Sequence, residues 1–404
     1  MPLVMTSSAG TLNSLSTENQ NLLAAIASEL ERRSDAFLGF GYARGILGAA
    51  LFNFYYGRLT QDQTYTAKAG RQIEQAFSMV NDFSWPYFSQ LSELGIFLQF
   101  IHEHGFSQEY PPDECLADVD GVVVRQMAKY LENGDVGGYT NGGLVLGRYL
   151  LSRLKTTRTV TDSLCQYVDE CDRWAVTSPQ GIYWRSKLFR DDRTYLSMPH
   201  GSAAMVLFLT RLWEEGLQSE QVRRLITDSI SFILSRRRNP EPYHSYFSDI
   251  LHLPNKPSRL SLCYGDLGIG YALLRAGQAL SLAQAQEAGL QILRYAAQRR
   301  TPEQTMLGDA GILYGASGLA LAFDNVYRLT HDASLAEARN HWFHQIPDWR
   351  TSHPEFLGFR SQYNHEIINT GVSVYEGIAG IGLTLMRLGS QTDLPHFDEL
   401  IWLL

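Results

Sequence analysis

A short apolar segment punctuated by glycine recurs seven times along the 404-residue chain, and this repeat limits the possible folds more than any other feature. The copies follow one another at intervals of about 50 to 60 residues, a spacing typical of architectures built from repeated units. The seven segments are GYARGILGAALF from Gly41, SELGIFLQFI from Ser92, TNGGLVLGRYLL from Thr140, PHGSAAMVLFL from Pro199, CYGDLGIGYALL from Cys263, LYGASGLALAF from Leu313 and YEGIAGIGLTLM from Tyr375.

A more polar stretch with apolar residues at helical spacing precedes each copy, as at Leu22, Leu23, Ile26 and Leu30. These stretches predict amphipathic helices with a polar outer face, whereas the glycine-marked segments are apolar nearly all round and predict helices packed on both sides. The alternation predicts an all-α fold, an α/α toroid of seven inner and seven outer helices. We expect a single domain over residues 17–404 after a flexible tail at residues 1–16.

The glycines indicate where the inner helices begin. Without a Cβ atom, glycine lets helix starts crowd around a central axis, and converging N-termini direct free N–H groups toward one cavity. Few β-branched alternating runs occur, which disfavours a parallel sheet. The predicted inner helices begin near Gly45, Gly95, Gly143, Gly201, Gly265, Gly315 and Gly377.

Composition excludes several classes of function. The chain has 34 basic and 42 acidic residues and no cluster of basic residues. The sequence therefore predicts no positively charged surface that would bind nucleic acid or anionic lipid. The longest apolar run, from residue 45 to 56, is too short to cross a bilayer, which needs about 20 residues. The four cysteines form no C-x-x-C pair and the N-terminus does not read as a signal peptide, so we expect a reducing, cytoplasmic location.

Two residues with reactive side chains stand at the entrances of predicted inner helices. His200 precedes the fourth and Cys263 the fifth, so the repeat places both at the same end of the toroid. Arg259 lies four residues before Cys263, and a nearby cation favours a thiolate. An imidazole exchanges protons near neutral pH. Together with Tyr264 these residues indicate a reactive centre, although each alone is as readily explained by packing or helix capping.

The segment around Cys263 resembles a known family motif. Ser261-Leu-Cys263-Tyr264-Gly265-Asp-Leu-Gly268-Ile is similar to the W-C-Y-G-x-x-G-I motif of lanthionine synthetase C-like proteins, the LanC cyclases, and the seven repeats extend the resemblance over nearly the whole chain. The resemblance implies an α/α toroid and the zinc-dependent addition of a peptide Cys thiol to dehydroalanine or dehydrobutyrine, which forms a thioether ring. It also implies a dehydrated precursor peptide as substrate, with a dehydratase and an export transporter as partners.

The resemblance also implies roles for individual residues. Cys263 matches the family's first zinc ligand, and Arg259 and Tyr264 match active-site positions of the same motif. His200, in a P-H-G sequence, resembles the family's proposed acid/base. Asp135 matches an acidic residue of the third repeat.

The chain departs from the family at the other two zinc ligands. These are an adjacent Cys-His pair in a C-H-G-x-x-G motif, and the matching residues here are Leu313 and Tyr314. A catalytic zinc takes three protein ligands, so Cys263 alone would hold it poorly. We therefore expect no family zinc, with Arg259 and Tyr314 stabilising charge while His200 moves protons. The other histidines that could substitute as ligands are His244, His252, His353 and His365.

Three functions compete at this point. The first is a LanC-like peptide cyclase, and the second is a LanC-like protein that binds a peptide or a partner enzyme without catalysis. Loss of the Cys-His pair would suit the second. A third is an α/α-toroid glycosidase, which would use two carboxylates such as Asp266 and Glu376. Acidic residues at helix starts also serve as partners of the helix dipole, however.

Overall fold

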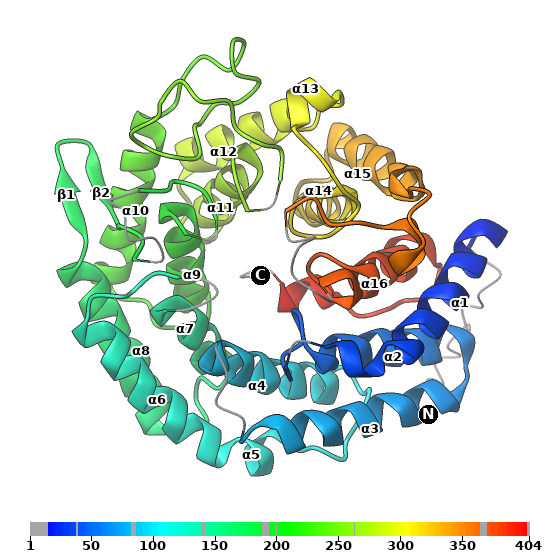
Figure 1. Cartoon of the computed structure of the whole chain (residues 1–404). Helices are drawn as coiled ribbons and strands as arrows, with labels where there is room; N and C mark the ends of the chain where they lie inside the picture. Colours follow the sequence, from blue (N-terminus) through cyan, green and yellow to red (C-terminus); the bar gives the residue numbers. More distant parts are fainter. Residues whose placement is uncertain are drawn as a thin grey trace, which may run out of the picture.

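The computed structural model describes residues 15–37, 39–81, 86–138, 142–187, 194–198, 200–261, 263–363 and 370–401, which form a ring of inner helices surrounded by outer helices (Figure 1). The inner helices are α2 (Ile46–Thr60), α4 (Tyr87–Glu103), α7 (Gly143–Ser152), α9 (Ser202–Glu214), α11 (Asp266–Ala279), α14 (Ala316–Thr330) and α16 (Ile378–Gly389). The outer helices are α1 (Thr17–Arg32), α3 (Gln63–Met79), α6 (Ala117–Glu132), α8 (Arg158–Arg173), α10 (Glu220–Ser235), α12 (Ala283–Ala296) and α15 (Ala333–Gln345). The predicted α/α toroid of seven inner and seven outer helices is confirmed.

Shorter elements join the long helices. They are the helical turns α5 (Pro112–Cys115) and α13 (Pro302–Thr305), the 3-10 turns η2 (Ser34–Ala36), η3 (Pro347–Trp349), η4 (Glu355–Gly358), η5 (Thr370–Val372) and η6 (Phe397–Leu400), and the strands β1 (Val176–Ser178) and β2 (Gly181–Tyr183). The two strands pair antiparallel and form a hairpin that packs on α10.

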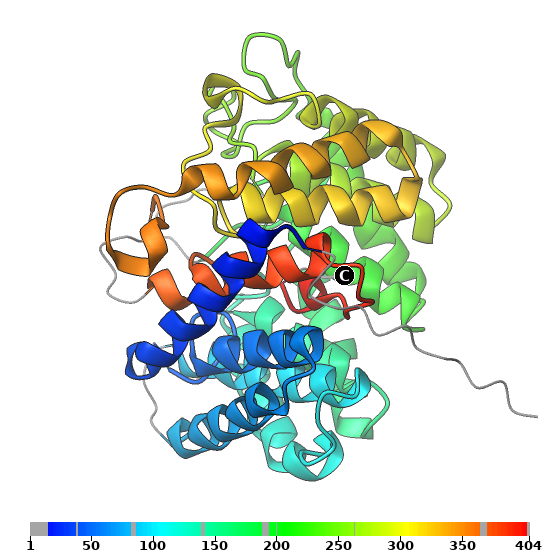
Figure 2. The ribbon, with the colours of Figure 1, turned by 90° about the vertical axis from the view of Figure 1, so that its right-hand side faces the viewer.

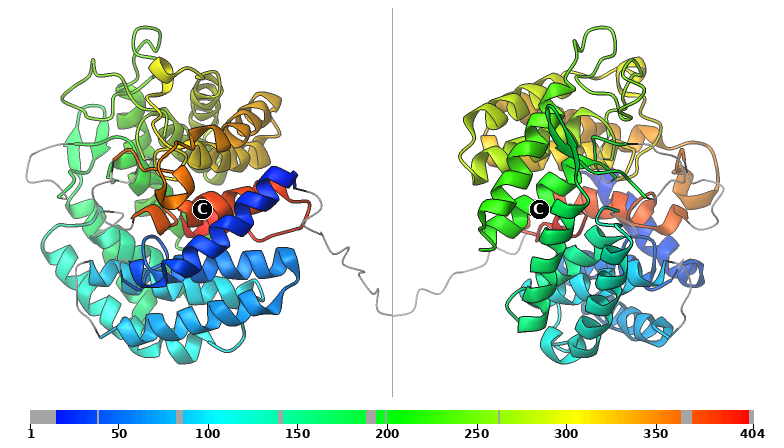
Figure 3. Two further views of the ribbon diagram at one scale, coloured as in Figure 1. Left: turned by 45° about the vertical axis from the view of Figure 1, so that its right-hand side comes forward. Right: turned by 90° about the vertical axis from the view of Figure 1, so that its left-hand side faces the viewer.

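Burial separates the two layers as the hydrophobic pattern predicts. Inner helix α2 buries 13 of its 15 residues, whereas its outer partner α3 buries three of 17. A helix that is apolar all round can be stable only with neighbours on every side, which the ring provides. Side views show the paired helices α14 and α15, and likewise α2 and α3, side by side (Figures 2 and 3).

Glycine occupies the N-cap of six inner helices, at Gly45, Gly142, Gly201, Gly265, Gly315 and Gly377. A tight backbone turn precedes these caps. Before α2, α9 and α14 its closing hydrogen bond runs from the N–H of the first helical residue to the carbonyl seven residues earlier, as from Ile46 to Gly39 (3.0 Å) and from Ala316 to Asp309 (3.1 Å). Before α7 the corresponding bond spans eight residues, from Gly143 to Asp135 (2.8 Å). A methyl group on these glycines would overlap the turn; at Gly201 it would meet the carbonyl oxygens of Tyr195 and Ser197.

The prediction of a helix start near Gly95 is wrong. Helix α4 begins two turns earlier, at Tyr87, and Gly95 lies in its interior. There the ring of Tyr149 on α7 occupies the space that a side chain at Gly95 would need. This glycine therefore permits close packing of two inner helices, and it marks no cap.

The segment that follows α16 enters the centre of the ring (Figure 1). The carbonyl of Leu400 accepts hydrogen bonds from the hydroxyl of Tyr42, just before α2, and from Arg148 on α7 (2.8 Å). Asp398, which is 1% exposed, accepts a hydrogen bond from Asn325 on α14 (2.6 Å). The segment thus connects inner helices from different sides of the ring.

The described residues contain no helix long and apolar enough to cross a membrane. Most of the predicted tail, residues 1–14, lies outside the described residues. Leu15 is buried and the Ser16 hydroxyl caps α1 by accepting from the N–H of Asn19 (3.2 Å).

We predict that Gly201→Ala destabilises the protein while Gly70→Ala does not. Gly70 lies on outer helix α3 with no atom within 4 Å of the added methyl group, so there alanine gains about 1 kcal/mol of helix propensity. At Gly201 the methyl group overlaps two carbonyl oxygens, a clash that costs about 1–3 kcal/mol or more. Thermal midpoints measured at one scan rate should fall for Gly201→Ala and hold or rise for Gly70→Ala. Equal midpoints would show that the turn has room for a side chain.

Candidate functional site

The residue that immediately precedes the N-cap glycine occupies an equivalent place in each repeat. Because six of the inner helices begin directly after a glycine N-cap, these residues gather at the N-terminal end of the ring. Five of them are described and polar, and we call them the pre-glycine ring: Arg44, His200, Tyr264, Tyr314 and Glu376.

Direct contacts join neighbouring members of the pre-glycine ring. The Nε atom of Arg44 lies 3.1 Å from a carboxylate oxygen of Glu376. The rings of Tyr264 and Tyr314 are nearly parallel, at 9°, with centroids 6.3 Å apart. Tyr195 connects the aromatic part to the imidazole, since its ring lies 6.3 Å from that of Tyr264 and 6.0 Å from that of His200.

Cys263 lies beside the pre-glycine ring as a buried thiol, 6% exposed. Burial raises its pKa to about 12, and the carboxylate of Glu376 acts in the same direction. The guanidinium groups of Arg44 and Arg259 oppose this rise without overcoming it. The thiol is therefore protonated at neutral pH and is a poor nucleophile.

His200 is neutral at physiological pH. Burial lowers the pKa of its imidazole to about 4, because the charged form loses its hydration. A neutral imidazole can accept a proton at one ring nitrogen, and the imidazolium that results is a strong acid. The group can therefore take up and return a proton within one reaction.

Arg259 holds its guanidinium against aromatic faces. Its Cζ atom lies 4.0 Å from the ring centroid of Tyr363 and 5.6 Å from that of Tyr314. Burial lowers the pKa of Arg259, but an arginine remains charged at any physiological pH. Tyr314 and the carboxylates of Asp249 and Asp309 act on its pKa in the opposite direction to burial, and none of the described ion pairs includes Arg259.

Asp135 is not brought into this cluster by any described contact. It lies in the turn before α7, where the charge of Lys187 opposes the effect of burial, which raises the pKa of Asp135 to about 6. The structure thus brings together His200, Tyr264 and Tyr314, with Cys263 and Arg259 beside them, whereas none of the described contacts connects Asp135 with these residues.

A model of the lanthionine synthetase C-like protein family matches residues 36–400. The chain belongs to this family. Of the solved structures, "Nisin cyclase" is similar to this LanC-like chain with a TM-score of 0.74 and 18% sequence identity, covering 96% of this chain and 97% of the other. This likeness shows the shared fold.

A sugar epimerase from a ruminal bacterium has a TM-score of 0.42 and 9% identity, covers 87% of this chain and 91% of the other, and supports no inference. None of the curated proteins compared with this chain matches it.

The zinc site of LanC-like proteins does not fit the residues present here. Leu313 carries no donor atom, and the pKa of the Tyr314 hydroxyl is raised by burial and by neighbouring Cys263, which disfavours the phenolate a metal would need. Within the described residues, no three His, Cys, Asp or Glu side chains form a group that could hold a metal. This includes His244, His252 and His353, while His365 lies outside the described residues.

The Arg44–Glu376 ion pair was not predicted from sequence. In the sequence alone, Glu376 is a candidate only as a glycosidase carboxylate, together with Asp266. The structure gives both acids structural partners, since Asp266 accepts the N–H groups of Tyr246 (2.8 Å) and Phe247 (3.0 Å). The signal that could have revealed the pair is its register, one residue before the glycine in two repeats.

We predict that the thiol of Cys263 resists alkylation in the native protein. Its burial and its pKa of about 12 leave little thiolate at pH 8, whereas Cys165 is exposed on outer helix α8. Iodoacetamide labelling followed by peptide mass spectrometry should modify Cys165 at least tenfold faster, with equal labelling after denaturation as control. Fast labelling of Cys263 in the folded protein would contradict the buried-thiol description.

Proposed function

We propose that this LanC-like protein closes thioether rings in a dehydrated precursor peptide without zinc, and that His200 is its proton-transfer group. The observation that carries the proposal is the pre-glycine ring, where a neutral imidazole adjoins an aromatic wall and Arg259 supplies a cation. Its substrate implies a dehydratase that acts first. Four cysteines without a disulfide fit a reducing cytoplasm.

The proposed step balances with one proton moved twice. The imidazole of His200 takes the proton of the peptide thiol while sulfur bonds to Cβ of the dehydro residue. The electrons of the C=C bond move to Cα and the carbonyl oxygen, and the resulting enolate faces the guanidinium of Arg259. The imidazolium then returns its proton to Cα, which completes the thioether.

Positioning of the peptide thiol next to the dehydro residue supplies the rest of the rate enhancement. Thiols add to dehydro residues without a catalyst, and holding the two groups together can replace a large part of the barrier. The ring pair of Tyr264 and Tyr314, with the 44%-exposed Tyr363 beyond it, offers a rigid aromatic surface on which a peptide can lie.

A second candidate function is peptide binding without chemistry. It is favoured by one observation, that Leu313 and Tyr314 stand at the positions of two metal ligands and Cys263 beside them is a protonated thiol. Such a protein would bind the dehydrated peptide and leave its free thiol count unchanged. The glycosidase function has no support from the geometry, since Asp266 and Glu376 are held by structural contacts.

We predict that His200→Ala lowers the rate of ring formation about 10²- to 10⁴-fold, the usual contribution of a general acid or base. Cys263→Ala should cost far less, because an inert thiol is removed. Ring formation is measured by thiol alkylation and mass spectrometry on a dehydrated peptide, with His344→Ala on outer helix α15 as the matched control.

The metal content of the same preparations decides the cofactor. We expect purified wild type to contain far less than one zinc per chain. About one zinc per chain, with complete inactivation by both His200→Ala and Cys263→Ala, would refute the metal-free proposal. Tight peptide binding without any ring closure in wild type would establish the second candidate.

We predict a flat pH profile for catalysed ring closure. The reactive forms are neutral His200, with a pKa of about 4, and the protonated peptide thiol, with a pKa of about 8.5, so kcat/KM should be level between roughly pH 5 and 8. Below the pKa of His200 the base is protonated and the rate falls. The uncatalysed reaction rises about tenfold per pH unit over this range because it needs thiolate. A catalysed rate with that same slope would exclude His200 as the base.

A further inference from the structure

A cavity of about 290 Å³ opens at the end of the ring opposite the pre-glycine ring. Three arginines line it, each from a different inner helix near its C-terminus: Arg211 from α9, Arg275 from α11 and Arg328 from α14. Glu399, on the segment that enters the centre of the ring, closes the remaining side.

The arginines share their carboxylate partners. Glu214 accepts hydrogen bonds from both Arg211 (3.0 Å) and Arg275 (2.9 Å), and Arg211 also pairs with Glu215 (3.7 Å). Arg328 pairs with two carboxylates, Asp324 (3.2 Å) and Asp398 (3.3 Å), and Asp324 also pairs with Arg339 (3.2 Å). Glu399 is the carboxylate among the lining residues, and the carboxylates that pair with the arginines are not among them.

The helix dipole explains why the arginines lie near helix C-termini, but not why three guanidinium groups line one cavity. Basic residues near a helix C-terminus interact favourably with the helix dipole, and Arg211 and Arg328 satisfy that rule. The dipole effect acts on each helix separately, however, and does not require three guanidinium groups around one open volume. The side chains of Arg211 and Arg328, 27% and 38% exposed, remain accessible from solvent.

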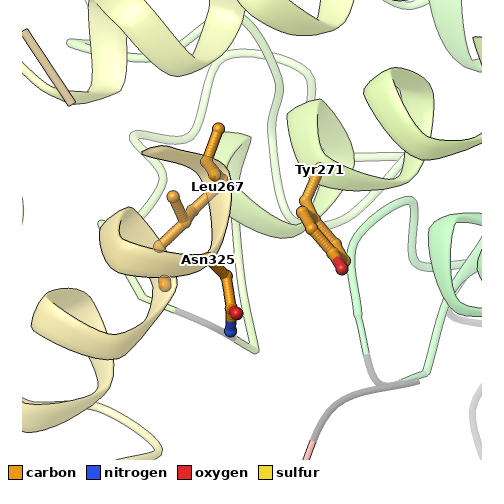
Figure 4. Close-up of a pocket in the computed structure, with 5 residues that line it drawn as sticks. Leu267, Tyr271 and Asn325 are labelled. Carbon is orange, nitrogen blue, oxygen red and sulfur yellow. The ribbon is translucent and has the colours of Figure 1, made fainter. Parts of the chain in front are cut away.

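The neighbouring wall is rigid. Tyr271 and Asn325 line both this cavity and a narrow apolar crevice at Leu267 that has no room for water. Figure 4 shows the two side chains pointing to the same side from α11 and α14. Asn325 is fixed by the carboxylate of Asp398 (2.6 Å), and the Tyr271 hydroxyl accepts from Arg275 (3.2 Å). The arginines therefore stand on a preorganised support, which lowers the entropic cost of binding.

The geometry points to this cavity as a binding site for a compact phosphoryl anion of about the size of pyrophosphate. A guanidinium group binds phosphate through a pair of N–H donors, and three guanidinium groups can surround one tetrahedral phosphoryl group. A carboxylate has only two oxygens, which one guanidinium group can satisfy. The volume is at the lower limit of ligand pockets, roughly 300 Å³, which excludes a peptide or a larger nucleotide. The inference is independent of the proposed ring chemistry.

Titration of the full chain with inorganic pyrophosphate at constant ionic strength tests the site. Calorimetry should show saturable binding at one site per chain, with succinate, a dicarboxylate of similar size, binding at least tenfold more weakly. Arg275→Gln should weaken pyrophosphate binding about tenfold or more, the effect of losing a charge-assisted hydrogen bond, and Arg211→Gln serves as a second variant should the first fold poorly.

Two further variants distinguish binding of pyrophosphate at this cavity from nonspecific electrostatic attraction to the protein. Arg294→Gln removes the same charge from outer helix α12, where Arg294 pairs with Asp332, and should leave binding unchanged. Glu399→Gln removes the carboxylate from the wall and should tighten binding several-fold, a gain that lost structural support would not produce. Absence of saturable binding to wild type, equal weakening by Arg294→Gln, or equal affinity for succinate would overturn the proposal.

Discussion

The tight backbone turn that ends on a glycine before an inner helix is the constraint on which the rest of the molecule depends. Before α2, α7, α9 and α14 it closes through a main-chain hydrogen bond that spans seven or eight residues, and it leaves no space for a side chain at the cap, as at Gly201. Its effect is to repeat one geometry around the ring. The residue before the glycine therefore points toward the same region in several repeats, whatever its chemistry.

This constraint explains how the site can change its chemistry without changing its shape. Where LanC-like proteins place a metal-binding pair, the same backbone here presents Leu313 and Tyr314, and Tyr314 lies parallel to Tyr264. The neighbouring repeats contribute Arg44 and Glu376, which form an ion pair. Glu376 is buried in this pair, with 4% of its surface exposed. A paired charge is tolerated in such a position, whereas removal of one partner alone would leave an uncompensated charge. Burial then keeps both Cys263 and His200 uncharged.

The fold was predictable because its signal is distributed over the whole chain. Seven apolar segments and the polar stretches between them determine the two layers regardless of local detail, as the burial of α2 and α3 shows. The start of α4 was not predictable in this way, because Gly95 has the composition of a cap but serves helix contact with Tyr149. In the site, His200 and Cys263 could be found from their residue types. Arg44 could not be found in this way, because its role depends on an ion pair with Glu376, which is far from it in the sequence.

The segment after α16 has a consequence for how the chain reaches its final form. The hydroxyl of Tyr42 and the carbonyl of Leu400, which it contacts, are separated by 358 positions in the sequence. Pairings between such remote residues are slow to form because a very long loop must close first. A nascent chain can assemble helix pairs one after another as it leaves the ribosome, but its centre stays open until residues near 400 have been synthesised. Closure of the centre of the ring is thus a late step in folding, and loss of this segment removes the contacts that connect Tyr42, α7 and α14.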